Sequence, residues 1–465
     1  MQFVSTRGGS PASFLEVLLG GPAPDGGLYL PDAWPKVLRS EIVGFAESPY
    51  AEMAYRIIRP FVGDAFSDAE FRADVDAAYA TFDHKAVVPL KELAPGRFLL
   101  ELFHGPTLAF KDIAMQLLGR LFARALDKQR RRATVIVATS GDTGSAAIAA
   151  LKGQRNLDVV VLHPHGRVSE VQRRQMTTVL DVNVHNIALE GTFDDTQAIV
   201  KALFADADFS ARTQLTAVNS INFARIVAQC VYYLTAGAAL GAGQGRAVSF
   251  VVPTGNFGDV FAGEAALRMG LPVGNLVIAT NSNDILVRAL HSGTYGAGRA
   301  HPTLSPSMDI QVASNFERAL FEASGRDATW VSRAMSEFSK MSTLTIPPAI
   351  LRGLQETYLA ASANDEETVA AIAQTYRESG TLIDPHTAVG VVAAEKVKGW
   401  LNGPVVLLAT AHPAKFTPAI TQAIGKAPEL PQKLGRLLAQ EERYTVLPNE
   451  VGAVRNFILE RALHR

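Results

Sequence analysis

Short apolar runs that alternate with helical patterns dominate most of this chain. Two β-branched runs, at 134–138 and 249–253, are each followed by a glycine turn and a small-residue helical pattern. Similar apolar runs lie at 159–164, 275–281 and 405–411. Their length and composition predict buried strands. Buried strands that alternate with helices favour an α/β fold with a mostly parallel sheet, whose ligands bind at the carboxyl ends of the strands.

The first 95 residues follow a different pattern, in which short helical stretches are separated by glycine and proline. Asp25, Gly26 and Gly27 signal a tight turn before a short apolar strand, and a helix is expected from Phe14 to Leu19. We interpret this segment as an appended domain or a lid whose polar loops reach a site. A packing module without chemistry of its own is the alternative.

A further helical pattern begins in the stretch His104 to Gln116, behind the start signals Pro106 and Thr107. Lys111 therefore falls in the first turn of the predicted helix. The positive end of the helix dipole disfavours an exposed ammonium by about 0.3–1 kcal/mol, so we expect a lowered pKa for Lys111. A lysine that deprotonates easily suits an imine with a carbonyl cofactor such as pyridoxal phosphate. The alternative is a solvated lysine at a helix start.

The turn after the run at 249–253 suits an anion. Gly255 and Gly258 flank Asn256 and Phe257, and Asp259 leads into a helical pattern. Successive backbone N–H groups and the helix dipole form an anion-binding nest, so a phosphate is expected here. We expect Gly255 and Gly258 to supply close backbone approach or a positive φ.

The turn after the run at 134–138 begins at Thr139 and also contains paired glycines, which are expected to let the backbone approach a ligand. Ser140, Asp142 and Thr143 offer hydrogen bonds at the start of a helix. Neither turn has the glycine spacing of a dinucleotide or nucleoside triphosphate site, which lowers both of those alternatives.

A third turn follows the run at 405–411. The Thr410 hydroxyl can bond a ring nitrogen without bringing charge, whereas an aspartate there would hold the ring protonated. His412 invites a catalytic interpretation. Because it precedes a proline in a turn, we expect a structural hydrogen-bonding role instead.

Composition narrows the class of protein. The chain has 465 residues, which suggests roughly three domain-sized units, and its formal net charge of −1 does not point to nucleic acid or an anionic membrane. Cys230 is the only cysteine and lies in an apolar helical pattern, so we expect a core residue in a reducing compartment. The start lacks the apolar stretch of a signal peptide, and no window approaches the length of a membrane span, so a cytoplasmic protein is expected.

With these residues in view, the chain resembles the threonine synthase family of fold-type II pyridoxal-phosphate enzymes over almost its full length. The matching stretches are STRG with APDGGLY, FHGPTLAFKD, ATSGDTGSAA, NSINFARIVAQ, PTGNFGD, SNFERALFE, DPHTAVG and ATAHPAKF. The resemblance implies that Lys111 binds the cofactor covalently and that Thr410 contacts its pyridine nitrogen. It implies a cofactor-phosphate loop formed by Gly255, Asn256, Phe257, Gly258 and Asp259.

The implied fold, similar to that of the tryptophan synthase β chain, has two parallel-sheet α/β domains with the cofactor in the cleft, plus an N-terminal domain. The expected boundaries are 1–95 for the N-terminal domain, 96–245 for the domain with Lys111 and the SGDTG loop, 246–425 for the domain with the phosphate loop, and 426–465 for a C-terminal tail. We also expect closure of the domains around the substrate.

The implied reaction converts O-phospho-L-homoserine and water to L-threonine and phosphate, the last step of threonine biosynthesis. Substrate-binding candidates are Thr139, Ser140, Asp142, Thr143 and Arg225, with Lys415 as a further candidate. No metal site is expected, and the protein is expected as a monomer or homodimer. The alternatives are a threonine or serine dehydratase of the same fold, a non-catalytic homologue that binds a phosphorylated metabolite, and, from a different class, a dinucleotide-dependent oxidoreductase.

Overall fold

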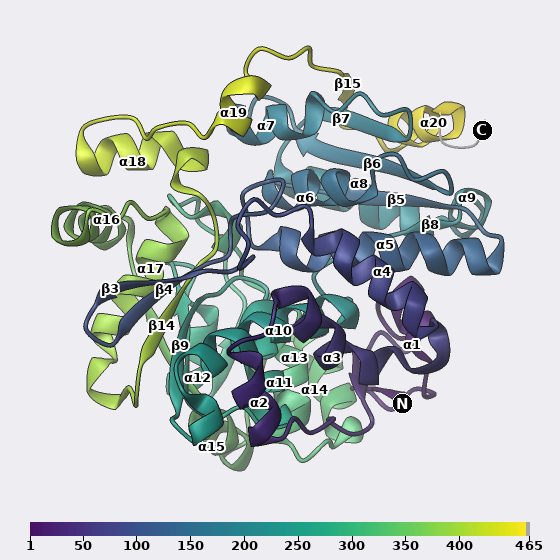
Figure 1. Cartoon of the computed structure of the whole chain (residues 1–465). Coiled ribbons are helices and arrows are strands. Elements are labelled where there is room, and N and C mark those ends of the chain that lie inside the picture. The colour runs from purple at the N-terminus through teal and green to yellow at the C-terminus, as the bar shows by residue number, and fades with distance from the viewer. Residues whose placement is uncertain (462–465) are drawn as a thin grey trace. The chain divides into compact units, whose positions relative to one another are not determined.

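The computed structural model describes residues 1–461, which form two compact units (Figure 1). Unit 1 comprises Met1–Phe110 and Ser220–Pro428, and unit 2 comprises Lys111–Asn219 and the chain from Glu429 onwards. Each unit is therefore discontinuous in sequence. The expected domains run in chain order, and their boundaries stay a prediction.

Unit 1 is built on a six-stranded sheet of order β13-β10-β9-β14-β4-β3, in which only the edge pair β3–β4 is antiparallel. Its strands, with the two small antiparallel pairs β1–β2 and β11–β12, are β1 (Phe3–Ser5), β2 (Tyr29–Pro31), β3 (Leu90–Ala94), β4 (Arg97–Glu101), β9 (Val248–Pro253), β10 (Val273–Thr280), β11 (Thr294–Gly296), β12 (Thr343–Thr345), β13 (Tyr358–Ser362) and β14 (Val405–Ala409). The predicted runs at 249–253, 275–281 and 405–411 are confirmed as strands of one sheet, apart from their last residues.

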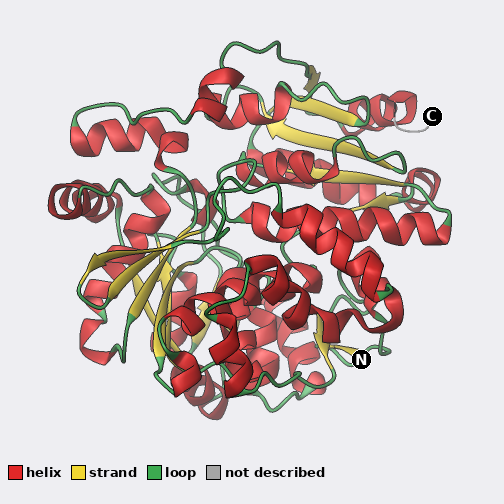
Figure 2. Cartoon of the chain, viewed as in Figure 1, coloured by secondary structure: helices red, strands yellow, loops and turns green. Residues whose placement is uncertain are grey.

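Helices surround these strands (Figure 2). They are α1 (Phe14–Gly20), α2 (Arg39–Phe45), α3 (Tyr50–Val62), α4 (Asp68–Tyr79), α10 (Phe223–Ala239), α11 (Gly258–Met269), α12 (Ile285–Ser292), α13 (Phe316–Ala323), α14 (Ala328–Met341), α15 (Pro348–Thr357), α16 (Asp365–Ser379), α17 (Pro385–Lys396) and α18 (Thr417–Ile424), with short 3₁₀ turns at Gly63–Ala65, Ala242–Gln244, Pro306–Met308, Lys398–Trp400 and Pro413–Phe416. Cys230 lies in α10 and is fully buried, as predicted.

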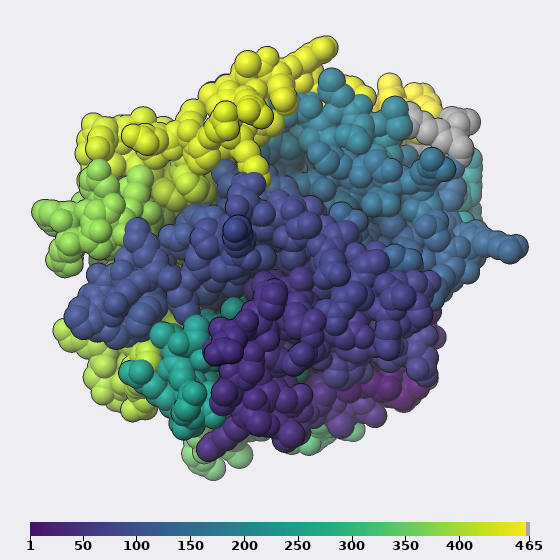
Figure 3. Space-filling view, viewed as in Figure 1, coloured from purple at the N-terminus to yellow at the C-terminus, as the bar shows by residue number. Residues whose placement is uncertain are grey.

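The N-terminal segment is packed into unit 1. The helix expected at Phe14 is confirmed as α1, and its start is fixed by a capping box in which Ser13 and Glu16 exchange hydrogen bonds. The guanidinium of Arg7 donates to both carboxylate oxygens of Glu317, at 2.9 and 2.7 Å. Figure 3 shows the purple N-terminal segment lying over teal parts of the same unit, where the Val37 N–H donates to the Met269 carbonyl at 2.8 Å.

Unit 2 is built on a five-stranded sheet of order β15-β7-β6-β5-β8, in which every pair is parallel. Its elements are α5 (Lys111–Gln129), β5 (Ala133–Ala138), α6 (Asp142–Leu151), β6 (Leu157–Pro164), α7 (Glu170–Thr177), β7 (Val184–Glu190), α8 (Phe193–Ala205), α9 (Ala207–Thr213), β8 (Leu215–Thr216), α19 (Gln432–Leu437), β15 (Thr445–Pro448) and α20 (Val451–Arg461). The predicted runs at 134–138 and 159–164 are confirmed as β5 and β6.

The segment expected as a C-terminal tail supplies an edge strand, because β15 pairs with β7 from Thr445–Ile187 to Pro448–Glu190. The chain just before β15 is held by Arg173, which donates to both carboxylate oxygens of Glu442 at 2.8 and 2.9 Å. Across residues 1–461, no helix has both the length and the apolar character needed to cross a membrane.

Candidate active site

Three of the predicted motifs leave the carboxyl ends of three neighbouring parallel strands in unit 1. The phosphate-loop motif follows β9, the motif with Thr410 follows β14, and the stretch that leads to Lys111 follows β4. Because β9, β14 and β4 are adjacent and parallel, these turns emerge at one edge of the sheet. The topology thus gathers residues that are more than 300 positions apart in the sequence.

The stretch before Lys111 is bound to the turn after β14. The Phe110 N–H donates to the Thr410 carbonyl at 2.8 Å, and the His412 N–H donates to the Leu108 carbonyl at 3.0 Å. Ala109 forms an isolated antiparallel bridge with Ala411. These contacts fix the backbone of the residue that immediately precedes Lys111 in the chain. Thr410 itself is buried at the end of β14.

Two polar residues of the same turn have structural partners. The Lys415 ammonium is buried and donates to the Thr107 carbonyl at 2.8 Å. The Nδ1 atom of His412 accepts the Ala414 N–H at 3.2 Å, and burial lowers the pKa of His412 to about 4. A neutral His412 therefore caps the turn at physiological pH.

Lys111 is the first residue of α5, so its predicted place in the first turn is confirmed. The helix begins later than the start signals suggested, because Leu108 adopts a left-handed conformation with φ of 58°. The Lys111 ammonium lies 3.8 Å from a carboxylate oxygen of Asp142. The lowered pKa expected for Lys111 stays a prediction.

The loop after β5 is organised by its own first residue. The Thr139 hydroxyl oxygen accepts the N–H groups of Gly141 and Gly144, both at 2.9 Å. Asp142 accepts a hydrogen bond from the Gln172 amide at 2.9 Å. A Cβ at Gly144 would lie 2.6 Å from the Thr139 methyl group, so packing within unit 2 requires a glycine at this position.

The loop after β9 has the geometry of an anion nest. Gly255 supplies the close backbone approach that was one of the two roles expected of its glycines, whereas the positive φ does not lie on a glycine. The left-handed residue is Phe257, with φ of 64°, and neither Gly255 nor Gly258 has a positive φ. A Cβ at Gly255 would lie 2.7 Å from the Ser307 carbonyl oxygen, so Gly255 is needed for close approach. Within residues 1–461, the backbone N–H groups of Asn256, Phe257 and Gly258 have no acceptor. Three such donors at the start of α11 suit a phosphate.

Two sets of contacts hold this loop from behind. The Asp259 carboxylate accepts hydrogen bonds from the hydroxyls of Tyr232 and Tyr233, so it is directed into the core. Burial, followed by the Asp259 charge, raises the pKa of both tyrosines well above the usual value. The Asn315 side chain donates to the Asn256 carbonyl at 2.9 Å. One carboxylate oxygen of Asp259 is therefore occupied by tyrosine hydroxyls of unit 1.

Arg225 is a buried cation without a counter-charge in the part of the chain that the structure describes. Its residue exposure is 4%, its Nε atom has no hydrogen-bond partner, and burial lowers its pKa to about 10. Arg318 is equally buried but satisfied, because it donates to the carbonyls of Tyr29 and Ile221 at 3.1 and 2.7 Å. An unpaired buried guanidinium is costly unless an anionic ligand neutralises it.

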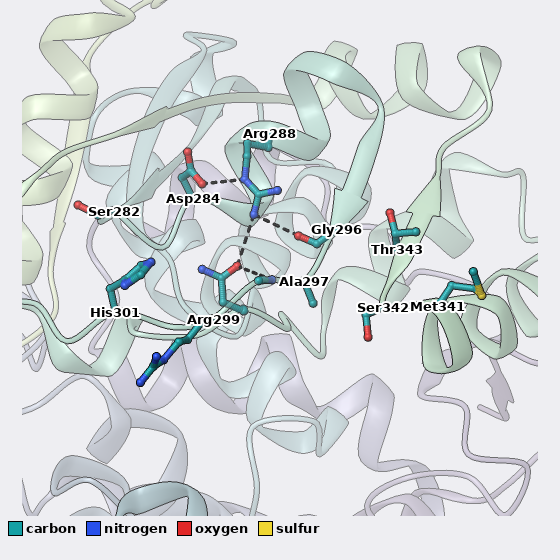
Figure 4. A pocket seen from close by; sticks show the side chains of 12 residues that line it. Ser282, Asp284, Arg288, Gly296, Ala297, Arg299, His301, Met341, Ser342 and Thr343 are labelled. Atoms are coloured by element: carbon teal, nitrogen blue, oxygen red, sulfur yellow. Dashed lines mark hydrogen bonds and ion pairs between the residues drawn. The ribbon is translucent and has the colours of Figure 1, made fainter.

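A surface pocket of about 530 Å³ in unit 1 is lined by none of the predicted site residues (Figure 4). Arg288 crosses it and donates to Asp284 at 2.8 Å and to the Gly296 carbonyl at 3.1 Å, while His301 and Arg299 lie along its side. The pocket is separate from the motifs at the strand ends. Among residues 1–461, no group of three or more His, Cys, Asp or Glu side chains is arranged to bind a metal ion.

Comparison with known proteins assigns these motifs to one family. The chain matches the family models for the threonine synthase N terminus at residues 2–79, for pyridoxal-phosphate-dependent enzymes at 87–337 and for the threonine synthase C-terminal region at 387–458. Threonine synthase of Pseudomonas aeruginosa is 51% identical over 98% of this chain and 98% of its own length. The chain belongs to the threonine synthase family.

Solved structures of the threonine synthase family agree with the fold. The crystal structure of pyridoxal-phosphate-bound threonine synthase from Brucella melitensis has a TM-score of 0.97 and 48% identity, with all of both chains covered. Threonine synthase from yeast has a TM-score of 0.94 and 36% identity, over 99% of this chain and 98% of its own. The expected fold class, a fold-type II pyridoxal-phosphate enzyme with an N-terminal threonine synthase segment, is confirmed.

Several residues that shape the site were not predicted from the sequence. Tyr232, Tyr233, Asn315 and Ser307 contact the phosphate loop from elements that are distant in the sequence. Asn315 lies in a stretch that resembles the threonine synthase family, which was the available signal for it. Ser307 lies in no such stretch, and only the structure places it beside Gly255.

Proposed function

We propose that Lys111 is the catalytic residue with which this chain converts O-phospho-L-homoserine and water to L-threonine and phosphate. The observation that carries the proposal is the gathering of three motif turns at the ends of β9, β14 and β4, the last of which leads directly into Lys111 at the start of α5. The cofactor is pyridoxal phosphate, which, when bound, withdraws electrons from the carbons of an amino-acid substrate.

Lys111 has two roles in this proposal. Its Nζ atom holds the cofactor covalently in the resting enzyme, and it then removes and returns protons at the substrate carbons as a general base and acid. The carboxylate of Asp142, 3.8 Å away, orients the amine and stabilises it when it carries a proton. One amine at the start of α5 thus serves successive proton transfers.

Residues of unit 1 bind the two ends of the cofactor. The N–H groups of Asn256, Phe257, Gly258 and Asp259 donate hydrogen bonds to its phosphate. Gly255 has no side chain, which allows the close packing of the loop. The Thr410 hydroxyl forms a hydrogen bond with the ring nitrogen. Because a hydroxyl carries no charge, the ring nitrogen is not held protonated, and the electron withdrawal is weaker than it would be beside a carboxylate.

The substrate is bound by two further groups. Ser140, Asp142 and Thr143 offer hydrogen bonds to its amino-acid end at the start of α6, whereas the oxygen of Thr139 already accepts two N–H groups of its own loop. Arg225 binds the phosphate of the substrate. A dianion is the counter-charge that this buried guanidinium lacks in the described chain.

The test is an assay of the purified protein with pyridoxal phosphate. We expect threonine and phosphate to form in equal amounts from O-phospho-L-homoserine. Formation of oxo-acid and ammonia from free threonine or serine, with no threonine from the phosphorylated substrate, would instead establish a dehydratase. Binding of the phosphorylated substrate without turnover would establish a non-catalytic homologue. We also propose a cytoplasmic monomer or homodimer, which sedimentation and cell fractionation test.

A further inference from the structure

The stretch DPHTAVG at the start of α17 contains a buried chain of hydrogen bonds that the proposed mechanism does not use. Asp384 caps the helix by accepting the His386 N–H at 2.9 Å, and its carboxylate also contacts the His386 Nδ1 atom at 2.8 Å. The Thr387 hydroxyl donates to its second oxygen. Asp384 is fully buried and His386 is 3% exposed, so these bonds do not exchange freely with water.

The other ring nitrogen of His386 connects this chain to the phosphate loop. The Ser307 N–H donates to the Nε2 atom at 3.3 Å. Because a backbone N–H can only donate, Nε2 must carry the lone pair, and Nδ1 must carry the proton that Asp384 accepts. The Asp384 carboxylate therefore selects the tautomer that can hold Ser307.

Ser307 is the residue whose carbonyl limits the space at Gly255. That oxygen lies 2.7 Å from the place where a Cβ of Gly255 would be. The 3₁₀ turn Pro306–Met308 thus supports the phosphate loop at Gly255. The Asn315 side chain supports it at the next residue by donating to the Asn256 carbonyl at 2.9 Å. A shift of Ser307 would therefore change the space available to Gly255.

We propose that Asp384 and His386 are positioning residues for cofactor retention, acting through Ser307 on the Gly255–Asp259 loop. This inference rests on the proposed role of that loop in binding the cofactor phosphate. In this proposal the two side chains act on the loop and not on the cofactor directly. They hold the loop in the conformation that keeps the N–H groups of Asn256, Phe257 and Gly258 pointing at one anion.

Charged and aromatic groups lie around the ring of His386. The charged groups that face the ring are Asp384 on its own helix and Asp309 on the loop beyond Ser307, and His412 lies within the field of Asp384. The ring of Phe416 packs against it with centroids 4.9 Å apart.

The experiment compares holoenzyme variants by the rate and equilibrium of cofactor loss on dialysis, followed by cofactor absorbance. His386→Leu removes the acceptor, and Asp384→Ala removes the carboxylate that selects the tautomer of His386. We expect both to raise the dissociation constant for pyridoxal phosphate by on the order of tenfold. His386→Gln retains an acceptor near the Nε2 position and should recover much of the loss. Thr387→Val, which leaves the bond to Ser307 intact, is the matched control.

Two readouts separate this role from a general loss of folding. The unfolding temperature of the cofactor-free protein should fall equally in His386→Leu and His386→Gln, whereas cofactor retention should differ between the two variants. At saturating cofactor, kcat of the variants should approach that of the wild type. Equal retention in His386→Leu and wild type would overturn the inference while leaving the proposed function intact. Failure of the wild type to bind pyridoxal phosphate would overturn the proposed function itself.

Discussion

Buried charge at single residues separates ligand-binding positions from structural ones in this chain. Arg225 and Arg318 are both buried and both have a pKa lowered by burial, to about 10 and about 9. Arg318 bonds carbonyl groups of its own unit, and Arg225 has no such partner in residues 1–461. The same residue type is therefore structural in one case and available to an anion in the other.

This contrast predicts opposite outcomes for two matched substitutions. Arg225→Met should raise the free energy of unfolding of the ligand-free protein by on the order of 1 kcal/mol or more, because it removes a buried charge that has no partner. It should raise KM for O-phospho-L-homoserine by on the order of tenfold or more. Arg318→Met leaves buried carbonyls unpaired and should destabilise the fold by about 3 kcal/mol. Denaturant unfolding and steady-state kinetics measure both. An unchanged KM in Arg225→Met would remove Arg225 from the substrate site.

His163 predicts a pH dependence of stability. The ring of this residue is buried, and burial lowers its pKa from 6.5 to about 4. Above pH 6.5 the ring is neutral whether the chain is folded or unfolded, so the full stability is present there. As pH falls from 6.5 to about 4, only the unfolded chain gains the proton, and stability is lost by about 1.4 kcal/mol per pH unit.

The corresponding variant is His163→Leu, which cannot take up the proton. We expect its unfolding free energy to exceed that of the wild type by an amount that grows below pH 6, while the two stay close at pH 8. His291→Gln at an exposed position is the control and should follow the wild type. Parallel curves for wild type and His163→Leu would show that His163 is not the group responsible.

The sequence specified some residues of the site better than others. Lys111 was placed from local helix signals and Cys230 from its apolar surroundings, because both depend on neighbours in the sequence. The sequence offered the glycines of the loop for a positive φ, whereas in the structure Phe257 has it, and the Phe257 side chain is buried against the rings of Phe316 and Tyr358. The roles of Ser307 and His386 depend on a contact between segments 79 positions apart.

At the scale of elements, strands with continuous apolar runs were predictable, and strands with mixed composition were not. The strands β5, β6, β9, β10 and β14 followed from their β-branched or aliphatic runs. The strands β7, β13 and β15 contain polar residues such as His185, Asn186 and Thr445, and their pairing partners supply what the local pattern lacks. Strand order also depends on non-local pairing, which no local pattern encodes.

Helix packing in unit 2 predicts the effect of a glycine on stability. A Cβ at Gly119 in α5 would lie 2.7 Å from the Ala150 carbonyl oxygen of α6, so Gly119→Ala forces the helices apart. We expect a net loss of about 1–3 kcal/mol despite the better helix propensity of alanine. Gly435 in α19 has no heavy atom within 4 Å of such a Cβ, so Gly435→Ala should gain up to about 1 kcal/mol. Urea unfolding distinguishes the two, and a gain in both would mean that α5 and α6 do not pack as described.

At the scale of the whole molecule, the sequence predicted an α/β enzyme of the correct fold class, since repeated strand and helix patterns and eight motif stretches agree. It did not indicate that each compact unit is assembled from separate segments, with residues 220–428 joining the first 110. Edge strand β15 illustrates the reason, because its pairing with β7 crosses more than 200 residues. Long-range pairing of this kind leaves little local trace.

The central claim is that Lys111 carries the cofactor and the chemistry. Borohydride reduction of the holoenzyme followed by peptide mapping tests it most directly, because reduction makes the bond between lysine and cofactor permanent. We expect the pyridoxyl label on the peptide that contains Lys111, and no label and no threonine formation in a folded Lys111→Ala variant. Lys415, which is buried at the end of a neighbouring strand, is the internal comparison. A label on Lys415 or any other lysine in the unmutated protein would contradict the account.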